Sequence, residues 1–200
     1  RDIGRAYRTL ARVPVFLGYT VVLSCCSGSF YVFLAGLPLV LAHYGVGPAS
    51  LGFYVMVVPF SYIAGNFVTT RMIRTTPEAH LTLTGQVIAN SGILLCLALA
   101  LGGVHSALAV ALPFMLLGFG HGLIIPPTLA GTVSVVPSLA GSAAAATGLT
   151  QQMMGALAGW VIGLVSHENA AAMAALMSAF MLLSALGQIV VVRLRSVEAA

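Results

Sequence analysis

Long apolar stretches, separated by short polar or glycine-containing breaks, follow one another along the chain from residue 14 to residue 192. Each is long enough for a helix, at about 1.5 Å per residue, to cross a hydrocarbon core of about 30 Å. The pattern predicts six transmembrane helices at residues 14–41, 49–70, 80–101, 106–133, 139–165 and 171–192. We therefore expect an all-α integral membrane protein, a bundle of six transmembrane helices. Residues 1–13 are expected to be the end of a cytoplasmic linker, and residues 193–200 a cytoplasmic tail.

The composition leads to the same class. Of the 200 residues, 60% are hydrophobic and 6% are charged. A soluble domain of this length cannot bury that much apolar surface, so we exclude a soluble protein. The cysteines Cys25, Cys26 and Cys96 lie within apolar stretches and have neither metal-ligand nor disulfide spacing. We interpret them as packing residues and expect no metal site and no cofactor.

The basic residues are all arginines, and each lies at an end of an apolar stretch: Arg1, Arg5, Arg8, Arg12, Arg71, Arg74, Arg193 and Arg195. With six helices, these segments fall on one side of the membrane. The three opposite breaks, near His43, Gly102 and His167, hold no arginine. The positive-inside rule then predicts cytoplasmic termini and a multi-pass protein of the inner (plasma) membrane. The arginines are not interleaved with aromatic residues, so the net charge of +4 does not indicate nucleic-acid binding.

The acidic residues Asp2, Glu78, Glu168 and Glu198 all fall in predicted loops or ends. A proton relay usually needs a carboxylate inside the membrane, and no predicted helix interior carries one. The sequence therefore does not indicate a proton-coupling site within these residues.

Polar and aromatic residues share one face of the first predicted helix. Ser27, Phe30 and Tyr31 fall there near mid-depth. Rings stack on an amphipathic organic ligand and hydroxyls orient it, so this face is a candidate cavity wall. Serines that bond their own helix and rings that fill packing space are the alternative.

The fourth predicted helix carries His121 near its middle, followed by Pro126 and Pro127. Prolines cannot donate to the carbonyls four residues earlier, so Gly122 and Leu123 are expected to keep free acceptors. Ligand contact, proton transfer and a structural hydrogen bond all remain open for His121. In the second helix, Pro59 predicts a bend. A role of this bend in gating and a static bend both remain open.

The fifth predicted helix has small residues three, four or seven apart, which form a stripe on one face: Gly141, Ala145, Gly148, Gly155, Gly159 and Gly163. Such a face lets two membrane helices approach closely. Gln152 lies on this stripe and is expected to bond across a helix pair. Gln151 is rotated onto the face of Thr147, and we take it as a further cavity candidate.

Three segments carry a family resemblance: residues 30–55 (FYVFLAGLPLVLAHYGVGPASLGFYV), residues 65–75 (GNFVTTRMIRT) and residues 137–157 (PSLAGSAAAATGLTQQMMGAL). Together they resemble the C-terminal half of a major facilitator superfamily transporter, most closely the drug:proton antiporters of the bicyclomycin-resistance type. The second segment, which includes Gly65 and Arg71, is similar to a degenerate copy of the superfamily's basic loop. The Asp of the better-known first copy of this loop is absent here, and Thr69 and Thr70 precede Arg71.

The resemblance implies half of a twelve-helix fold. Helices one and four would line the central cavity, two and five would form the interface between halves, and three and six would face lipid. It also implies that proton-coupling carboxylates lie mainly in an N-terminal half. The expected function is thus half of a proton-coupled exporter of small amphipathic molecules that works by alternating access. We expect Pro59, Gly65, Arg71, Pro126, Gly141, Gly148, Gln152 and Gly155 to serve helix packing and gating.

Two other interpretations stay open: a major facilitator carrier for a sugar or metabolite, and a membrane protein of a different class that works as a self-contained six-helix homodimer. An enzyme such as an intramembrane serine protease would need a serine and a histidine at matched depth. Ser142 lies near a predicted helix end and His121 near mid-depth, so we expect no enzyme and no catalytic residue.

Overall fold

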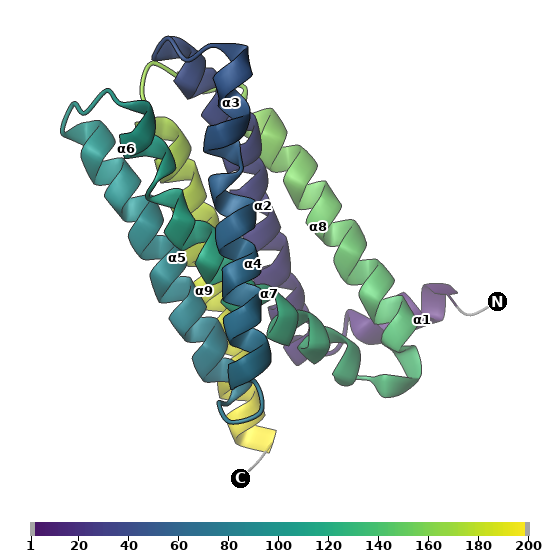
Figure 1. The fold of residues 1–200 in the computed structure, drawn as a ribbon. Helices are drawn as coiled ribbons and strands as arrows, with labels where there is room; N and C mark the ends of the chain where they lie inside the picture. Colours follow the sequence, from purple (N-terminus) through teal and green to yellow (C-terminus); the bar gives the residue numbers. More distant parts are fainter. Residues whose placement is uncertain (1–2, 199–200) are drawn as a thin grey trace.

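The computed structural model describes residues 3–198 as helices joined by short turns (Figure 1). Arg1 and Asp2, which entered the charge pattern above, lie outside the described residues, as do the last two alanines. The elements are α1 (Ile3–Leu10), α2 (Pro14–His43), α3 (Pro48–Val55), α4 (Val57–Met72), α5 (Glu78–Leu101), α6 (Ala107–Ala111), α7 (Phe114–Ser134), η1 (Pro137–Leu139), α8 (Ala140–Ile162) and α9 (Ala171–Glu198).

Two of the expected spans are broken helices. The span expected at residues 49–70 consists of α3 and α4, separated at Met56. Pro59 follows three residues later and has no N–H for the Val55 carbonyl, which interrupts the hydrogen-bond ladder there. The span expected at residues 106–133 consists of α6 and α7, and Pro113 lies directly before α7.

The ends of the chain are more helical than expected. Residues 1–13 contain α1, and α9 continues to Glu198, well past residue 192. The first turns of the expected tail are therefore an extension of the last helix.

Among the described residues, five helical segments are long and apolar enough to cross a membrane: Pro14–His43, Pro48–Met72, Glu78–Leu101, Ala107–Ser134 and Ala171–Ser196. α8 is of similar length, with 23 residues. It is not among these five because it is rich in alanine, glycine, threonine and glutamine rather than large apolar residues. The structure thus establishes a multi-pass helical membrane protein, and the sixth crossing remains a prediction.

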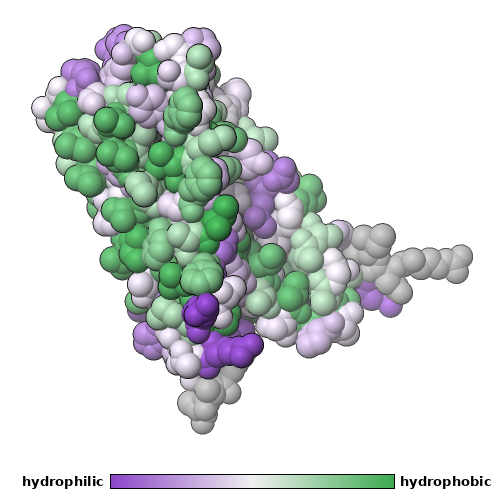
Figure 2. Space-filling view, in the orientation of Figure 1, coloured by the Kyte–Doolittle hydropathy of each residue, from purple (hydrophilic) through white to green (hydrophobic). Residues whose placement is uncertain are grey.

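The helices form a bundle from which α8 diverges (Figure 1). α2 packs on α9 and α8, and α7 packs on α4 and α5. The main core lies between α2, α5, α7 and α9, with the rings of Phe33 and Phe114 edge to face at 5.2 Å between centroids. Apolar side chains cover the outer flank of the bundle, and hydrophilic ones gather toward its ends (Figure 2).

Glycines on α7 bring three helix backbones unusually close. A Cβ added to Gly122 would lie 2.6 Å from the Tyr62 carbonyl oxygen of α4. A Cβ added to Gly85 of α5 would lie 2.6 Å from the carbonyl oxygen of Gly120. Alternate glycines of α7 therefore face α4 and α5 in turn. Close approach through small residues, expected for the fifth span, is concentrated here instead.

The arginine-bearing segments lie at one end of the bundle. α1, the α4–α5 turn and the C-terminal end of α9 are all found there (Figure 1). At this end Arg195 Nη1 lies 3.4 Å from Glu78 Oε2, and the Arg195 guanidinium lies 5.2 Å from the centre of the Tyr19 ring. This arrangement agrees with the prediction that the arginine-bearing segments lie on one side of the membrane. That this side is the cytoplasmic one stays a prediction.

Candidate functional site

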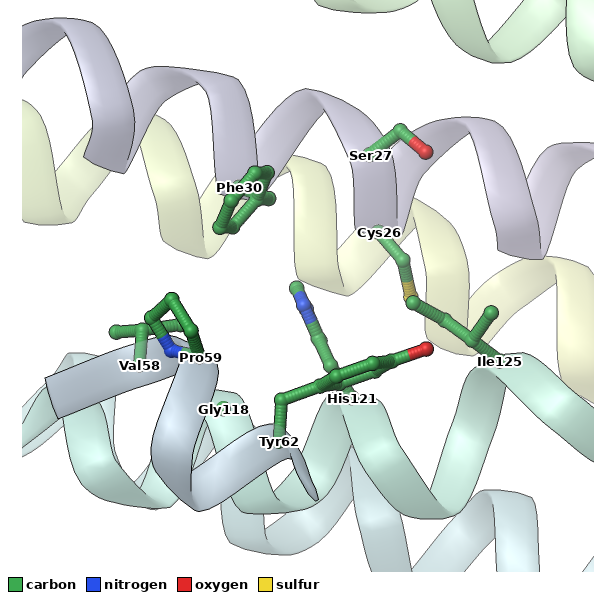
Figure 3. Close-up of a pocket in the computed structure, with 9 residues that line it drawn as sticks. All are labelled: Cys26, Ser27, Phe30, Val58, Pro59, Tyr62, Gly118, His121 and Ile125. Carbon is green, nitrogen blue, oxygen red and sulfur yellow. The ribbon is translucent and has the colours of Figure 1, made fainter. Parts of the chain in front are cut away.

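A cavity of about 220 Å³ lies between α2, α4 and α7 near the middle of the bundle (Figure 3). Its lining combines aromatic rings, two hydroxyls, one imidazole and apolar side chains: Cys26, Ser27, Phe30, Val58, Pro59, Tyr62, Gly118, His121 and Ile125. None of these side chains is a carboxylate that could bind a metal ion, and none is an arginine or lysine that could bind an anion. The cavity is therefore chemically suited to a neutral or amphipathic organic molecule rather than to a metal ion or a strongly anionic one.

The local sequence explains why α4 and α7 form one wall of this cavity. Gly118 of α7 meets the Ser61 hydroxyl and the Val58 carbonyl of α4, and a Cβ at Gly118 would clash with both. This contact holds the two backbones together at the base of the cavity. One turn further along α7, His121 projects past α4, and Ile125 follows on the same face.

His121 is the polar centre of the cavity. Figure 3 shows its imidazole pointing from α7 toward α2, into the space bordered by Phe30 and Cys26. The side chain is only 2% exposed, and its Nε2 is buried with no hydrogen-bond partner among the described residues. A buried polar atom without a partner costs about 1–3 kcal/mol, so a bound molecule that pairs with Nε2 gains free energy here.

The Gly122 carbonyl, which the sequence predicts to be a free acceptor, has a hydrogen-bond partner in the structure. The Gly122 carbonyl, which Pro126 leaves without its helical donor, accepts a hydrogen bond of 2.8 Å from the Thr69 hydroxyl of α4. The expectation of a free acceptor at Gly122 is therefore wrong. Thr69 belongs to the basic-loop segment noted in the sequence, and its hydroxyl here ties α4 to α7.

The remaining cavity candidates form the contact between α2 and α8. The Ser27 hydroxyl donates to Gln151 Oε1 at 3.0 Å, and the Tyr31 hydroxyl donates to Gln152 Oε1 at 3.3 Å. Ser24 adds a third bond, to Thr150 Oγ1 at 3.1 Å. Ser27 thus lies both at the cavity and at this seam, whereas Tyr31 and Gln151 lie beside the cavity without lining it.

The small-residue stripe of α8 is mostly without a partner among the described residues. Gly155 packs on the Tyr31 ring, whose Cδ2 would lie 2.5 Å from an added Cβ. Gly141, Gly148 and Gly159 have no atom within 4 Å of such a Cβ. The expected close approach of this stripe to another helix of the chain is therefore found at one position only, because the rest of the stripe faces outward.

The other packing and gating candidates are spread over α4 and α7. Pro59 lines the cavity, and Gly65 meets the Phe119 carbonyl of α7. Arg71 is exposed at the end of α4, with its guanidinium 4.7 Å from the centre of the Phe67 ring. Pro126 is half-buried in α7. The structure brings Pro59 to the candidate site and leaves the other three outside it.

The sequence reasoning missed several cavity residues: Cys26, Val58, Tyr62, Gly118 and Ile125. A signal for some of them was present. In Gly118-Phe119-Gly120-His121-Gly122, glycines surround the histidine, which indicates close neighbours on either side of it. Tyr62 lies three residues after Pro59 and so shares its helix face.

The model of the family described as Major Facilitator Superfamily matches residues 1–159 of the chain. Comparison with curated proteins finds no match. The match includes all three helices of the cavity and confirms the resemblance at the level of the superfamily. Because it spans well over half of the 200 residues, the chain belongs to the major facilitator superfamily of membrane transporters.

Proposed function

We propose that this chain is one half of a proton-coupled exporter of small amphipathic molecules, resembling the drug:proton antiporters of the bicyclomycin-resistance type. The cavity between α2, α4 and α7 carries the proposal. Its rings suit stacking, and the Tyr62 hydroxyl and the unpartnered His121 Nε2 suit orientation of a ligand by one or two hydrogen bonds.

The size of the cavity supports the participation of a second helical unit. Ligand pockets usually measure about 300–1,000 Å³. At about 220 Å³, this cavity holds only part of a drug-sized molecule. The rest of the site would come from a unit packed against the outward stripe of α8, where glycines without neighbours leave room for a close helix contact.

The distribution of carboxylates supports a division of labour. Glu78 lies at the first turn of α5, and Glu168 lies in the turn before α9. Neither lines the cavity. Proton coupling would therefore depend on carboxylates of the second unit, while this chain contributes binding and movement.

Interrupted helices next to the cavity supply sites for movement. α3 and α4 meet at Met56, three residues from Pro59 in the cavity wall, and α6 and α7 meet at Pro113. Transporter helices commonly break beside the substrate site, and rocking of one half against the other exposes that site to each side in turn. We place both termini in the cytoplasm and the protein in the inner membrane on the basis of the arginine pattern.

The test is efflux from proteoliposomes. The full protein containing this chain is reconstituted with a fluorescent amphipathic dye, and a proton gradient is imposed. Ser27→Leu enlarges a side chain of the α2 wall of the cavity and removes its hydrogen bond to Gln151. We expect it to reduce dye transport at least about tenfold, which corresponds to a loss of about 1.4 kcal/mol. Ser91→Leu is the matched control, because Ser91 is exposed on α5 away from the cavity.

Three other outcomes would contradict the proposed function or its site. Transport that ignores the proton gradient and is blocked by sugars or metabolites would replace the exporter with a carrier of that class. Dye transport by this chain alone, purified as a homodimer, would remove the need for a different second unit. Equal activity of Ser27→Leu and Ser91→Leu would show that the cavity is not the transport site.

A further inference from the structure

A second cavity, of about 380 Å³, lies between α5 and α9. It shares no residue with the cavity between α2, α4 and α7. It is formed by the first turns of α5 and the last turns of α9, at the end of the bundle where the arginine-bearing segments gather (Figure 1). We call it the α5–α9 groove.

The walls of the α5–α9 groove are apolar and face outward. Leu83 of α5 is 53% exposed, and Ile189 and Val192 of α9 are 47% and 42% exposed. In a helix bundle that crosses the membrane, a surface of this kind contacts lipid chains rather than water. Ala185 keeps the groove open between the two helices.

The mouth of the groove carries positive charge. Arg193 lies there with His80 across from it, and both are exposed. The neighbouring Arg195 is paired with Glu78 at 3.4 Å. Arg193, in contrast, has no carboxylate within ion-pair distance among the described side chains, so its charge is available to an anion. A guanidinium binds phosphate oxygens through two parallel hydrogen bonds.

Inside the mouth, a buried amide lacks a hydrogen-bond partner. Gln188 lines the groove, is 3% exposed, and its Oε1 has no partner among the described residues. Gln86, across from it on α5, is 2% exposed and donates to the Ser184 hydroxyl at 3.1 Å, while its own Oε1 is also without a partner. A hydrocarbon chain cannot satisfy these acceptors, so the occupant of the groove must bring a hydrogen-bond donor.

From these observations we propose that the α5–α9 groove binds one anionic phospholipid with a hydroxyl-bearing headgroup. The phosphate binds Arg193 and His80, a headgroup hydroxyl donates to Gln188, and an acyl chain runs along Leu83 and Ile189. Basic pockets between transmembrane helices at the membrane surface bind acidic headgroups in the same way. This inference rests on the membrane-spanning fold and is independent of the proposed transport function.

The first experiment measures lipid retention by native mass spectrometry of the full protein purified from membranes and stripped of lipid in detergent. Three probes are added separately: phosphatidylglycerol, phosphatidylethanol (anionic, without a headgroup hydroxyl) and phosphatidylcholine (zwitterionic). We expect retention of one lipid to fall in that order. The step from phosphatidylglycerol to phosphatidylcholine should be at least about fivefold, which one arginine near an acidic headgroup provides.

Variants locate the site. Arg193→Gln should lower phosphatidylglycerol retention to the level of phosphatidylcholine, whereas Arg74→Gln, an exposed arginine in the α4–α5 turn, should leave it unchanged. Ala185→Phe fills the groove and should abolish the preference for phosphatidylglycerol over phosphatidylcholine. The same change at Ala179, exposed on α9 outside the groove, is its control for folding.

Three results would overturn the proposal or a part of it. Equal retention of phosphatidylglycerol and phosphatidylcholine would remove the charge selectivity on which it depends. Equal effects of Arg193→Gln and Arg74→Gln would show that general surface charge, and not this groove, retains the lipid. Equal retention of phosphatidylglycerol and phosphatidylethanol would refute the assigned hydroxyl contact with Gln188.

Discussion

The contact of α7 with α4 allows the effect of a single methyl group to be worked out. In Gly122→Ala, the new Cβ would lie 2.6 Å from the Tyr62 carbonyl oxygen, 2.7 Å from the Asn66 nitrogen and 2.8 Å from the Gly65 carbonyl carbon. Ordinary contacts of a Cβ begin at 3.4 Å. All three atoms belong to the α4 backbone and cannot rotate away, so the two helices must separate by about 0.8 Å.

This separation has two costs and one gain. Overpacking a tight contact costs about 1–3 kcal/mol. The same movement stretches the 2.8 Å bond from the Thr69 hydroxyl to the Gly122 carbonyl, which contributes about 0.5–1.5 kcal/mol. Alanine favours a helix over glycine by about 1 kcal/mol, which offsets part of the loss. We expect Gly122→Ala to lower the free energy of unfolding by about 2 kcal/mol.

The assay is reversible unfolding of the purified protein in mixed micelles, followed by circular dichroism. Gly148→Ala is the control, because its new Cβ meets no atom within 4 Å. It makes the same change of residue in the middle of another helix, and it should be neutral or stabilising by up to about 1 kcal/mol. If the two variants unfold at the same denaturant concentration, the glycine contact between α4 and α7 does not determine stability and the reasoning fails.

Four further predictions concern the contact between α4 and α7, the small-residue stripe of α8, the cavity and the contact between α2 and α8. Thr69→Val should destabilise the protein by about 1 kcal/mol in the native background but by less when combined with Pro126→Ala, whose restored N–H can serve the same carbonyl; a double-mutant cycle of unfolding measures this coupling. Gly148→Leu should leave the stability of this chain unchanged but weaken its association with a second helical unit, measured by pull-down; unchanged association would remove the stripe from that interface. His121→Phe removes a buried atom without a partner, so it should preserve or raise stability while reducing dye transport, and equal transport would exclude the imidazole from ligand binding. Gln151→Ala should change which compounds are exported more than it changes the amount of protein, and a uniform loss that follows expression would indicate a structural role.

Much of the fold follows from the apolar pattern because a membrane span must satisfy its own backbone hydrogen bonds and must be long. That pattern cannot locate interruptions within a span. The breaks at Met56 and before Phe114 depend on the prolines that follow or precede them. Pro38, by contrast, lies inside an unbroken α2, so a proline alone does not decide the outcome.

The site was harder to predict than the fold because helix rotation is not encoded in any single span. The structure brings Ser27, Phe30 and His121 to one cavity. The sequence alone indicates only that they are polar or aromatic residues at similar depth. The sequence alone does not show which face of α8 turns inward. Thr147 and Ala158 are buried, whereas the glycine stripe on another face is largely open, since Gly155 alone of its glycines meets a ring of α2.

Two helix contacts near the cavity differ in how easily the helices can slide: the contact between α4 and α7 (the α4–α7 seam) and the contact between α2 and α8 (the α2–α8 seam). At the α4–α7 seam, Gly118 and Gly122 place backbone against backbone, and sliding by half a turn would bring carbonyl oxygens or side chains into positions that only glycine fits. At the α2–α8 seam, the contacts of Ser27 and Tyr31 are side-chain hydrogen bonds of about 0.5–1.5 kcal/mol each, to partners that are half-buried or exposed. Such bonds can exchange partners at little net cost. We therefore expect α4 and α7 to move as one body during transport, with His121 fixed on that body, while α2 and α8 shift relative to each other and change the width of the cavity.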